Sequence, residues 1–160
     1  MRIGVPKEIK PQENRIGLTP ESVKVLTSSG HKVLVQNNGG FESGFYNNQY
    51  IKAGATIVDK AEDIFNDSEV IVKVKEPLSD EIKMIKENQV IFTYLHLAAD
   101  KKLTEGLVKS KSICIAVITI QNIVASGSLG GKIHLEQAAR KLPRSMYEDR
   151  KSTRLNSSHT

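Results

Sequence analysis

The sequence has a single cysteine and no tryptophan among its 160 residues. One cysteine cannot form an internal disulfide. The sequence contains neither the cysteine pair nor the spaced histidine pair that would predict a zinc site. No apolar run approaches the roughly 20 residues that span a bilayer, and residues 1–7 lack the hydrophobic stretch of a secretory signal. We therefore expect a cytoplasmic protein with no membrane partner and no metal, in which Cys114 is a small core residue.

Charge is nearly balanced over most of the chain. The formal net charge is +5, but residues 1–122 contain 16 basic and 15 acidic side chains, whereas residues 123–160 contain 7 and 3. The lysines of the longer part are interspersed with acidic residues and lack the interleaved aromatic residues typical of single-strand binding. Length and composition favour one ordinary globular domain and argue against a nucleic-acid partner.

Short β-branched runs alternate with short helical patterns through the first 118 residues. This alternation predicts an α/β fold in which helices cover a mainly parallel sheet. Thr19-Pro20-Glu21 predicts a helix start, because a hydroxyl can cap, proline suits the first helical position and an acid suits the positive end of the dipole. The expected strands are 3–5, 32–36, 70–75, 89–95 and 112–118, and the expected helices lie between 20 and 30 and over 48–53, 61–66, 81–87 and 101–109.

Glycine-rich phosphate motifs are missing or incomplete. No G-x-G-x-x-G sequence follows an expected strand, so we expect no cofactor-binding residues within the chain. Gly127–Lys132 resembles a phosphate-binding loop only in its glycine content, because the spacing differs and no serine or threonine follows the lysine.

Three residues suited to anion chemistry follow expected strands. Arg15 lies in the loop after the first strand, Lys75 ends the strand over 70–75, and His96 follows the strand over 89–95. In parallel sheets, ligands bind outside the carboxyl ends of the strands. A guanidinium can hold a carboxylate by two hydrogen bonds, an ammonium acts as a point charge, and a histidine titrates near neutrality. The three side chains are therefore candidates for one anion-binding site with a proton-transfer group.

Each of the three residues also has a structural interpretation. Lys73 and Lys75 point to one face of their expected strand, as on an exposed sheet face or a helix-covered edge. His96 between two leucines is typical of a core histidine, and Arg15 in a polar loop is typical of a surface ion pair. Spacing alone favours the structural interpretation, most clearly for Lys75.

Three blocks of sequence resemble the N-terminal domain of alanine dehydrogenases. They are GVPKEIK (4–10) with ENR (13–15) and LTP (18–20), then KVKEP (73–77), then FTYLHLAA (92–99). The blocks occur in the family's order and spacing, over residues 1 to about 121. The related proton-translocating transhydrogenases share the opening block but lack the Tyr-Leu-His-Leu stretch, so His96 favours the dehydrogenases.

The resemblance implies a Rossmann-like or flavodoxin-like three-layer domain of a two-domain, hexameric enzyme. Such enzymes use NAD to convert L-alanine reversibly to pyruvate and ammonium. By resemblance, Arg15 and Lys75 hold the substrate, and Lys75 and His96 are catalytic, His96 as the acid/base. The family's NAD-binding domain, with its second catalytic acid, is not in the 160 residues, so we expect this truncated chain to be inactive alone.

The sequence departs from the family pattern after about residue 116. We expect residues 1–122 to form the substrate-side domain and 123–148 a divergent connecting segment with a short basic helix over 135–142. Residues 149–159 read DRKSTRLNSSH, which matches one reading frame of a common sequencing adapter, so we interpret 149–160 as foreign to the natural protein rather than as a polar natural tail. Two alternatives remain: a fragment of a pyridine nucleotide transhydrogenase alpha subunit, and a non-catalytic carboxylate-binding domain.

Overall fold

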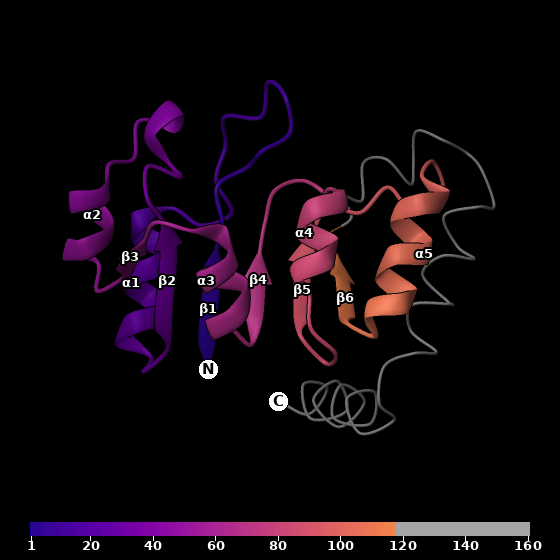
Figure 1. The fold of residues 1–160 in the computed structure, drawn as a ribbon. Coiled ribbons are helices and arrows are strands. Elements are labelled where there is room, and N and C mark those ends of the chain that lie inside the picture. The colour runs from indigo at the N-terminus through magenta and orange to yellow at the C-terminus, as the bar shows by residue number, and fades with distance from the viewer. Residues whose placement is uncertain (118–160) are drawn as a thin grey trace, which may run out of the picture. The chain divides into compact units, whose positions relative to one another are not determined.

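The computed structural model describes residues 1–117, and this part of the chain contains a six-stranded, all-parallel sheet (Figure 1). The strands are β1 (Arg2–Val5), β2 (Lys32–Gln36), β3 (Thr56–Val58), β4 (Val70–Val72), β5 (Val90–Thr93) and β6 (Ile113–Ala116). The helices are α1 (Pro20–Ser28), α2 (Asn47–Lys52), α3 (Ala61–Asp67), α4 (Ser79–Met84) and α5 (Lys101–Ser110), with a short 3-10 helix, η1 (Phe41–Ser43).

The strand order is β3-β2-β1-β4-β5-β6, which is the order of doubly wound nucleotide-binding folds. The chain builds outward from β1 to β3, then returns to the other side of β1 and builds outward again to β6. The expected α/β fold with a parallel sheet is confirmed. This order creates a switch point between β1 and β4, where loops on the two halves diverge and leave room for a ligand.

Both faces of the sheet are covered, as the alternation along β1 shows. Ile3 and Val5 pack in one hydrophobic cluster with Val23 of α1. Gly4, between them, points to the other face, where an added Cβ would overlap Ser68 and would lie 2.6 Å from Cγ2 of Ile64. Helix α3 therefore packs so closely on β1 that only glycine fits at that position.

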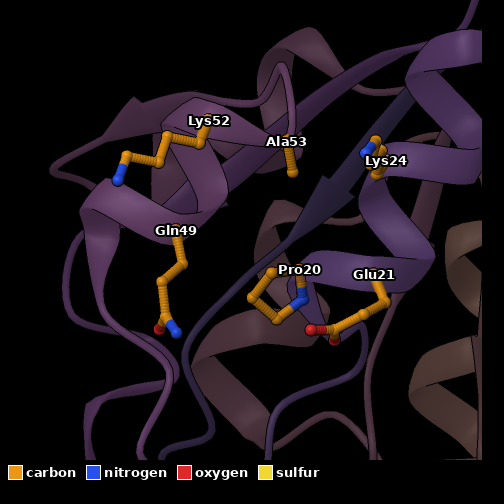
Figure 2. A pocket seen from close by; sticks show the side chains of 6 residues that line it. All are labelled: Pro20, Glu21, Lys24, Gln49, Lys52 and Ala53. Atoms are coloured by element: carbon orange, nitrogen blue, oxygen red, sulfur yellow. The ribbon is translucent and has the colours of Figure 1, made fainter.

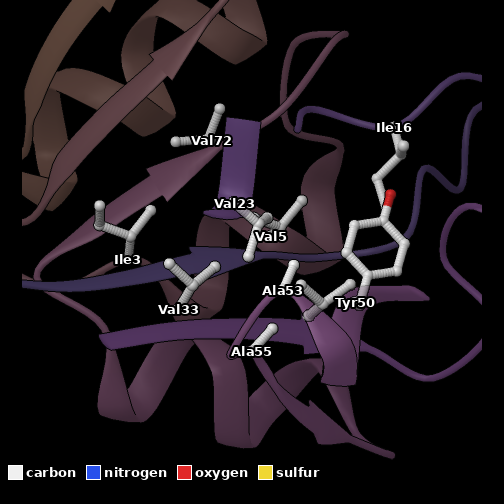
Figure 3. Packing of buried hydrophobic residues seen from close by; sticks show 10 residues of the cluster. Ile3, Val5, Ile16, Val23, Val33, Tyr50, Ala53, Ala55 and Val72 are labelled. Atoms are coloured by element: carbon white, nitrogen blue, oxygen red, sulfur yellow. The ribbon is translucent and has the colours of Figure 1, made fainter. Parts of the chain in front are cut away.

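The first hydrophobic cluster joins α1 and α2 to the N-terminal half of the sheet (Figure 3). Its largest member, Tyr50, is 1% exposed, and its hydroxyl donates a hydrogen bond to the Leu18 carbonyl at 2.9 Å. Burial raises the pKa of Tyr50 to about 12. Because Leu18 directly precedes the α1 cap, this bond fixes the end of the long segment that leads from β1 into α1.

The second cluster lies under α3, α4 and α5. It contains Ile64, Phe65, Ile71, Ile91 and Leu103, each 3% exposed or less. Burying each such side chain contributes about 1.5–3 kcal/mol. The expected core residue Cys114 is half-buried at the edge of this cluster.

Helix α1 begins as expected, with the Thr19 hydroxyl accepting a hydrogen bond from the Ser22 amide at 3.3 Å. Two strands differ from the predictions. The strand expected over 70–75 ends at Val72, so Lys75 lies in the following loop rather than on a strand face. Strand β3 was not predicted at all.

Among residues 1–117, no helix has the length and apolar character needed to cross a membrane, and no group of three or more potential metal ligands is found. The expected connecting segment 123–148, the Gly127–Lys132 loop, the helix over 135–142 and the tail 149–160 lie outside the described residues.

Candidate active site

Arg15, Lys75 and His96 all follow neighbouring strands at one edge of the sheet. Arg15 lies in the segment after β1, Lys75 comes three residues after the end of β4, and His96 three residues after the end of β5. Strands β1, β4 and β5 are adjacent and parallel, so their carboxyl ends share an edge. The structure therefore places all three predicted residues after the carboxyl ends of adjacent strands, Arg15 and Lys75 on the two sides of the switch point and His96 one strand further along.

The segment over 6–19 carries Arg15 across the end of β4. In Figure 1 the chain after β1 rises above the carboxyl ends of the strands. A Cβ added to Gly17 would lie 2.5 Å from the Val72 carbonyl oxygen, so the two backbones touch. Ile16, 8% exposed, packs in the first cluster (Figure 3). Arg15 therefore directly precedes two residues that anchor the segment over β4.

The backbone of Lys75 is held from two sides. The amides of Val74 and Lys75 donate hydrogen bonds to Oε1 of Glu8, at 2.6 and 3.4 Å. The Thr93 hydroxyl, fully buried at the end of β5, donates to the Lys75 carbonyl at 2.8 Å. Neighbours on both sides of β4 thus fix the point from which the half-buried Lys75 side chain extends.

Beneath this loop, Lys73 forms a buried ion network with Glu8 and Glu81. The Lys73 ammonium lies 3.1 Å from Oε2 of Glu8 and 2.7 Å from Oε1 of Glu81, and the three side chains are 1–3% exposed. Oε2 of Glu81 accepts a further hydrogen bond from the Leu78 amide at 2.9 Å. Each carboxylate thus has partners for both oxygens, as buried charges require.

Of the two positions predicted for Lys73, the exposed sheet face is wrong, because Lys73 is 4% exposed and pairs with Glu81 of α4. That prediction rested on alternation within a strand over 70–75, but β4 ends at Val72 and the alternation rule does not extend into the loop. The buried position of Lys73 is possible because Glu8, from the segment after β1, and Glu81, from the helix that follows β4, neutralise its charge.

Arg15 is held by Glu13 through a two-point contact. Nε and Nη2 of Arg15 donate to Oε1 and Oε2 of Glu13 at 2.7 and 2.6 Å, and the Arg15 amide donates to Oε1 at 3.0 Å. The Glu13 side chain is 7% exposed, whereas that of Arg15 is 63% exposed. The hydrogen bond from Arg15 is the main cause that lowers the pKa of Glu13 to about 2, and the nearby charge of Lys75 acts in the same direction.

This pKa predicts how the Glu13–Arg15 pair responds to acid. Because the pKa of Glu13 lies below its ordinary value of 4.5, the pair stabilises the fold fully above that value and loses its contribution as pH falls through about 2. We expect urea unfolding of the wild-type chain and of Glu13→Gln to differ at pH 6 and to converge as pH approaches 2. A ¹³C titration of the Glu13 carboxyl with a midpoint near 4.5 would contradict the pairing.

His96 is exposed and lies within electrostatic range of Glu76. Burial alone would raise the pKa of Glu76, but the hydrogen bond and charge of Lys10, together with the charge of His96, lower it. Glu76 forms an ion pair with Lys10 through Oε1, while Oε2 is buried without a hydrogen-bond partner in the described part of the chain. Lys75 acts on Glu13 and His96 on Glu76, so the site is a cluster of compensating charges.

A hollow lies between α1 and α2 (Figure 2). It is lined by Pro20, Glu21, Lys24, Gln49, Lys52 and Ala53. The charged groups that line it are exposed, and in Figure 2 the Lys52 side chain extends away from Glu21 and Lys24. None of the three predicted site residues contributes to it, and its charged groups do not converge, so we do not assign a function to it.

Comparison with known proteins identifies the relatives of this domain. The family described as "Alanine dehydrogenase/PNT, N-terminal domain" matches residues 4–129. The chain belongs to this family. An alanine dehydrogenase of Staphylococcus epidermidis (strain RP62A) is 50% identical over 129 residues, which cover 81% of this chain and 34% of that protein. An alanine dehydrogenase of Methanococcus maripaludis is 46% identical over 121 residues, covering 76% of this chain and 32% of that protein.

Solved structures of the alanine dehydrogenase/PNT family share the fold. A structure of L-alanine dehydrogenase matches with a TM-score of 0.71 and 47% identity, over 72% of this chain and 32% of that one. A transhydrogenase from Sinorhizobium meliloti matches with a TM-score of 0.68 and 28% identity, over 72% and 33%. The resemblance seen in the sequence is confirmed, and the chain spans about a third of the length of these relatives.

The carboxylates of the site were missed by reasoning from the sequence. Glu8 and Glu13 belong to the first block of sequence that resembles the alanine dehydrogenase family, yet no role is predicted for either from the sequence. The only signal in the sequence was the position of Glu13 two residues before Arg15, which is close enough for a local ion pair. Nothing local to Lys73 indicated its partners, because Glu8 lies in a segment far from it in the sequence.

Proposed function

We propose that the chain is the substrate-binding part of an alanine dehydrogenase, which converts L-alanine and water to pyruvate and ammonium while reducing NAD. The observation that carries the proposal is that Arg15, Lys75 and His96 follow the carboxyl ends of three adjacent strands, in a chain 50% identical to a protein named alanine dehydrogenase. The lower identity to the transhydrogenase, 28% against 47% for the L-alanine dehydrogenase structure, favours this activity over a transhydrogenase fragment.

In this proposal Arg15 and Lys75 bind the small zwitterionic substrate. The exposed guanidinium of Arg15 binds the substrate carboxylate, and Lys75 lies beside the substrate carbonyl oxygen. Alanine offers only a methyl group for apolar contact, so charge-assisted hydrogen bonds of about 1.5–3 kcal/mol each supply most of the affinity. The Lys75 ammonium also stabilises the negative charge that develops on the oxygen when the carbonyl is reduced.

His96 is the proposed acid/base. Its exposed imidazole is free to approach a bound substrate, and it accepts a proton from the water molecule that attacks the substrate imine. In the reverse direction the same group returns the proton as water leaves.

The described residues do not fit NAD. The connection after β1 is the long segment 6–19 rather than a short glycine-rich turn into a helix, and it places the buried carboxylates of Glu8 and Glu13 near the switch point. Carboxylates there would repel a pyrophosphate, whereas dinucleotide sites present helix N-termini and glycine amides. NAD must therefore bind to a part of the enzyme other than residues 1–117.

We also propose the domain bounds, the assembly, the location and the partners of the enzyme. We infer that residues 1–122 form the domain, that the complete enzyme is a cytoplasmic homo-oligomer, and that its partners are small molecules rather than nucleic acid or membrane. The matched residues cover 34% and 32% of two of the relatives, which supports a larger enzyme of which this domain is one part.

A graft tests the proposed activity. Residues 1–117 should replace the equivalent segment of the Staphylococcus epidermidis enzyme, to which the chain is 50% identical over 129 residues. We expect the hybrid to reduce NAD with L-alanine, and Lys75→Ala in the graft to abolish that reaction without unfolding it, because Lys75 lies in a loop. A folded hybrid that binds pyruvate but never reduces NAD would instead favour a non-catalytic carboxylate-binding domain.

A further inference from the structure

The contact between Glu13 and Arg15 uses only one edge of the guanidinium. Glu13 accepts from Nε and Nη2, and among residues 1–117 no partner of Nη1 is found. A guanidinium has five N–H donors in a rigid plane, so an Nε–Nη2 contact leaves the Nη1–Nη2 edge for a second two-point contact. That edge has the geometry that matches a carboxylate.

The exposures of the two side chains indicate which partner is fixed. Glu13 is 7% exposed and Arg15 is 63% exposed, so the carboxylate lies on the protein side of the pair and the guanidinium on the solvent side. The Glu13 oxygens also hold the backbone amide of Arg15, which ties both the main chain and the side chain to one group. An arginine held in this way does not have to lose its rotamer freedom when a ligand binds.

We propose that Glu13 is a positioning residue, which fixes the guanidinium of Arg15 with its Nη1–Nη2 edge directed to the carboxylate of the substrate. This inference rests on the proposed function, because it assumes that Arg15 binds a carboxylate. Glu13 does not compete with the substrate, since it uses Nε–H and one N–H of Nη2, which leaves Nη1 and the second N–H of Nη2 for the adjacent edge. The charge of Lys75, which acts on Glu13, offsets the repulsion between the two carboxylates on these adjacent edges.

The test uses the 160-residue chain and two independent readouts. ¹⁵N NMR of the Arg15 Nε–H group reports whether the guanidinium is ordered, with no ligand present. Titration with pyruvate, followed by the same spectra, reports affinity. The variants are Glu13→Gln, in which an amide N–H faces Nη2, and Glu13→Asp, which keeps the carboxylate. Glu69→Gln is the matched control, because Glu69 pairs with Arg2 at the amino ends of β1 and β4.

We expect Glu13→Gln to remove the ordered Nε–H signal of Arg15. Pyruvate binding should weaken about three- to tenfold, because the long Arg15 side chain then loses its rotamer freedom when the ligand binds, whereas Glu13 orders it beforehand in the wild-type chain. Glu13→Asp should retain the signal in part and bind with intermediate affinity, and Glu69→Gln should change neither readout. If Glu13→Gln fails to fold, the Glu13→Asp variant still provides both readouts.

Two results would overturn the positioning role. Unchanged affinity with an unchanged Nε–H signal would show that Arg15 is ordered without Glu13, and tighter binding in Glu13→Gln would show that Glu13 competes with the substrate. A wild-type chain that does not bind pyruvate would contradict the proposed function instead. In that case the Nε–H signal alone decides whether Glu13 orders Arg15.

Discussion

Replacing Lys73 with methionine is expected to lower the free energy of unfolding by about 3–5 kcal/mol, because removing one partner of a buried ion network leaves the others uncompensated. In this chain the groups left behind are the carboxylates of Glu8 and Glu81, which are 2% and 3% exposed. Methionine fills much of the lysine volume, so the loss reports charge rather than a cavity. Urea unfolding at neutral pH measures the change.

Two further variants separate the network from general effects of losing a lysine. Lys83→Met removes an exposed lysine of α4, whose side chain is 75% exposed, and should leave the unfolding free energy nearly unchanged. The triple variant Glu8→Gln, Lys73→Met, Glu81→Gln removes all three charges while keeping amide oxygens for the backbone amides of Val74 and Leu78. It should recover most of the loss, and a triple variant as unstable as Lys73→Met would refute the charge argument.

In the grafted enzyme, His96→Ala is expected to lower kcat by about 10²–10⁴-fold, the usual contribution of a general acid or base. Folding should be unaffected because His96 is exposed and lies outside both hydrophobic clusters. The measurement is NADH formation with L-alanine at saturating substrate. Because Arg15 and Lys75 remain, KM should change far less than kcat.

His31→Ala is the matched control for His96. His31 lies at the amino end of β2, with Nδ1 3.4 Å from the N-terminal nitrogen, and so at the opposite edge of the sheet from the proposed site. Its loss should leave kcat unchanged. If His96→Ala instead produced aggregated or unfolded protein, the interpretation of His96 as a core histidine would be supported.

The fold was predictable where strands are long enough to show a pattern. Residues 32–36 match β2 without error, because a β-branched run bounded by turn residues is a clear signal. Strand β3 was missed because three residues are too few for an alternating pattern to be recognised. Its place in the sheet comes from pairing with β2, which is a property of the folded chain rather than of the local sequence.

The candidate site was predictable only in part. The positions of Arg15, Lys75 and His96 followed from parallel strands and their carboxyl ends, which is a general property of the fold. The groups that support Lys75 were not predictable, because they come from other strands. Glu8, in the segment after β1, accepts a hydrogen bond from the Lys75 amide, and Thr93, at the end of β5, donates one to the Lys75 carbonyl. Such contacts depend on the register of β1, β4 and β5, which no local pattern specifies.

The strand order also determines when during folding the site can exist. Strand β2 pairs with β1 across a single helix, but β4 reaches β1 only after α1, β2, α2, β3 and α3 have been synthesised and the chain has returned to its first strand. Loop-closure entropy makes this long-range pairing slower than the local ones. We therefore expect Arg15 and Lys75 to come together at a late step, so that on the proposed function the onset of pyruvate binding during refolding would report the pairing of β4 with β1.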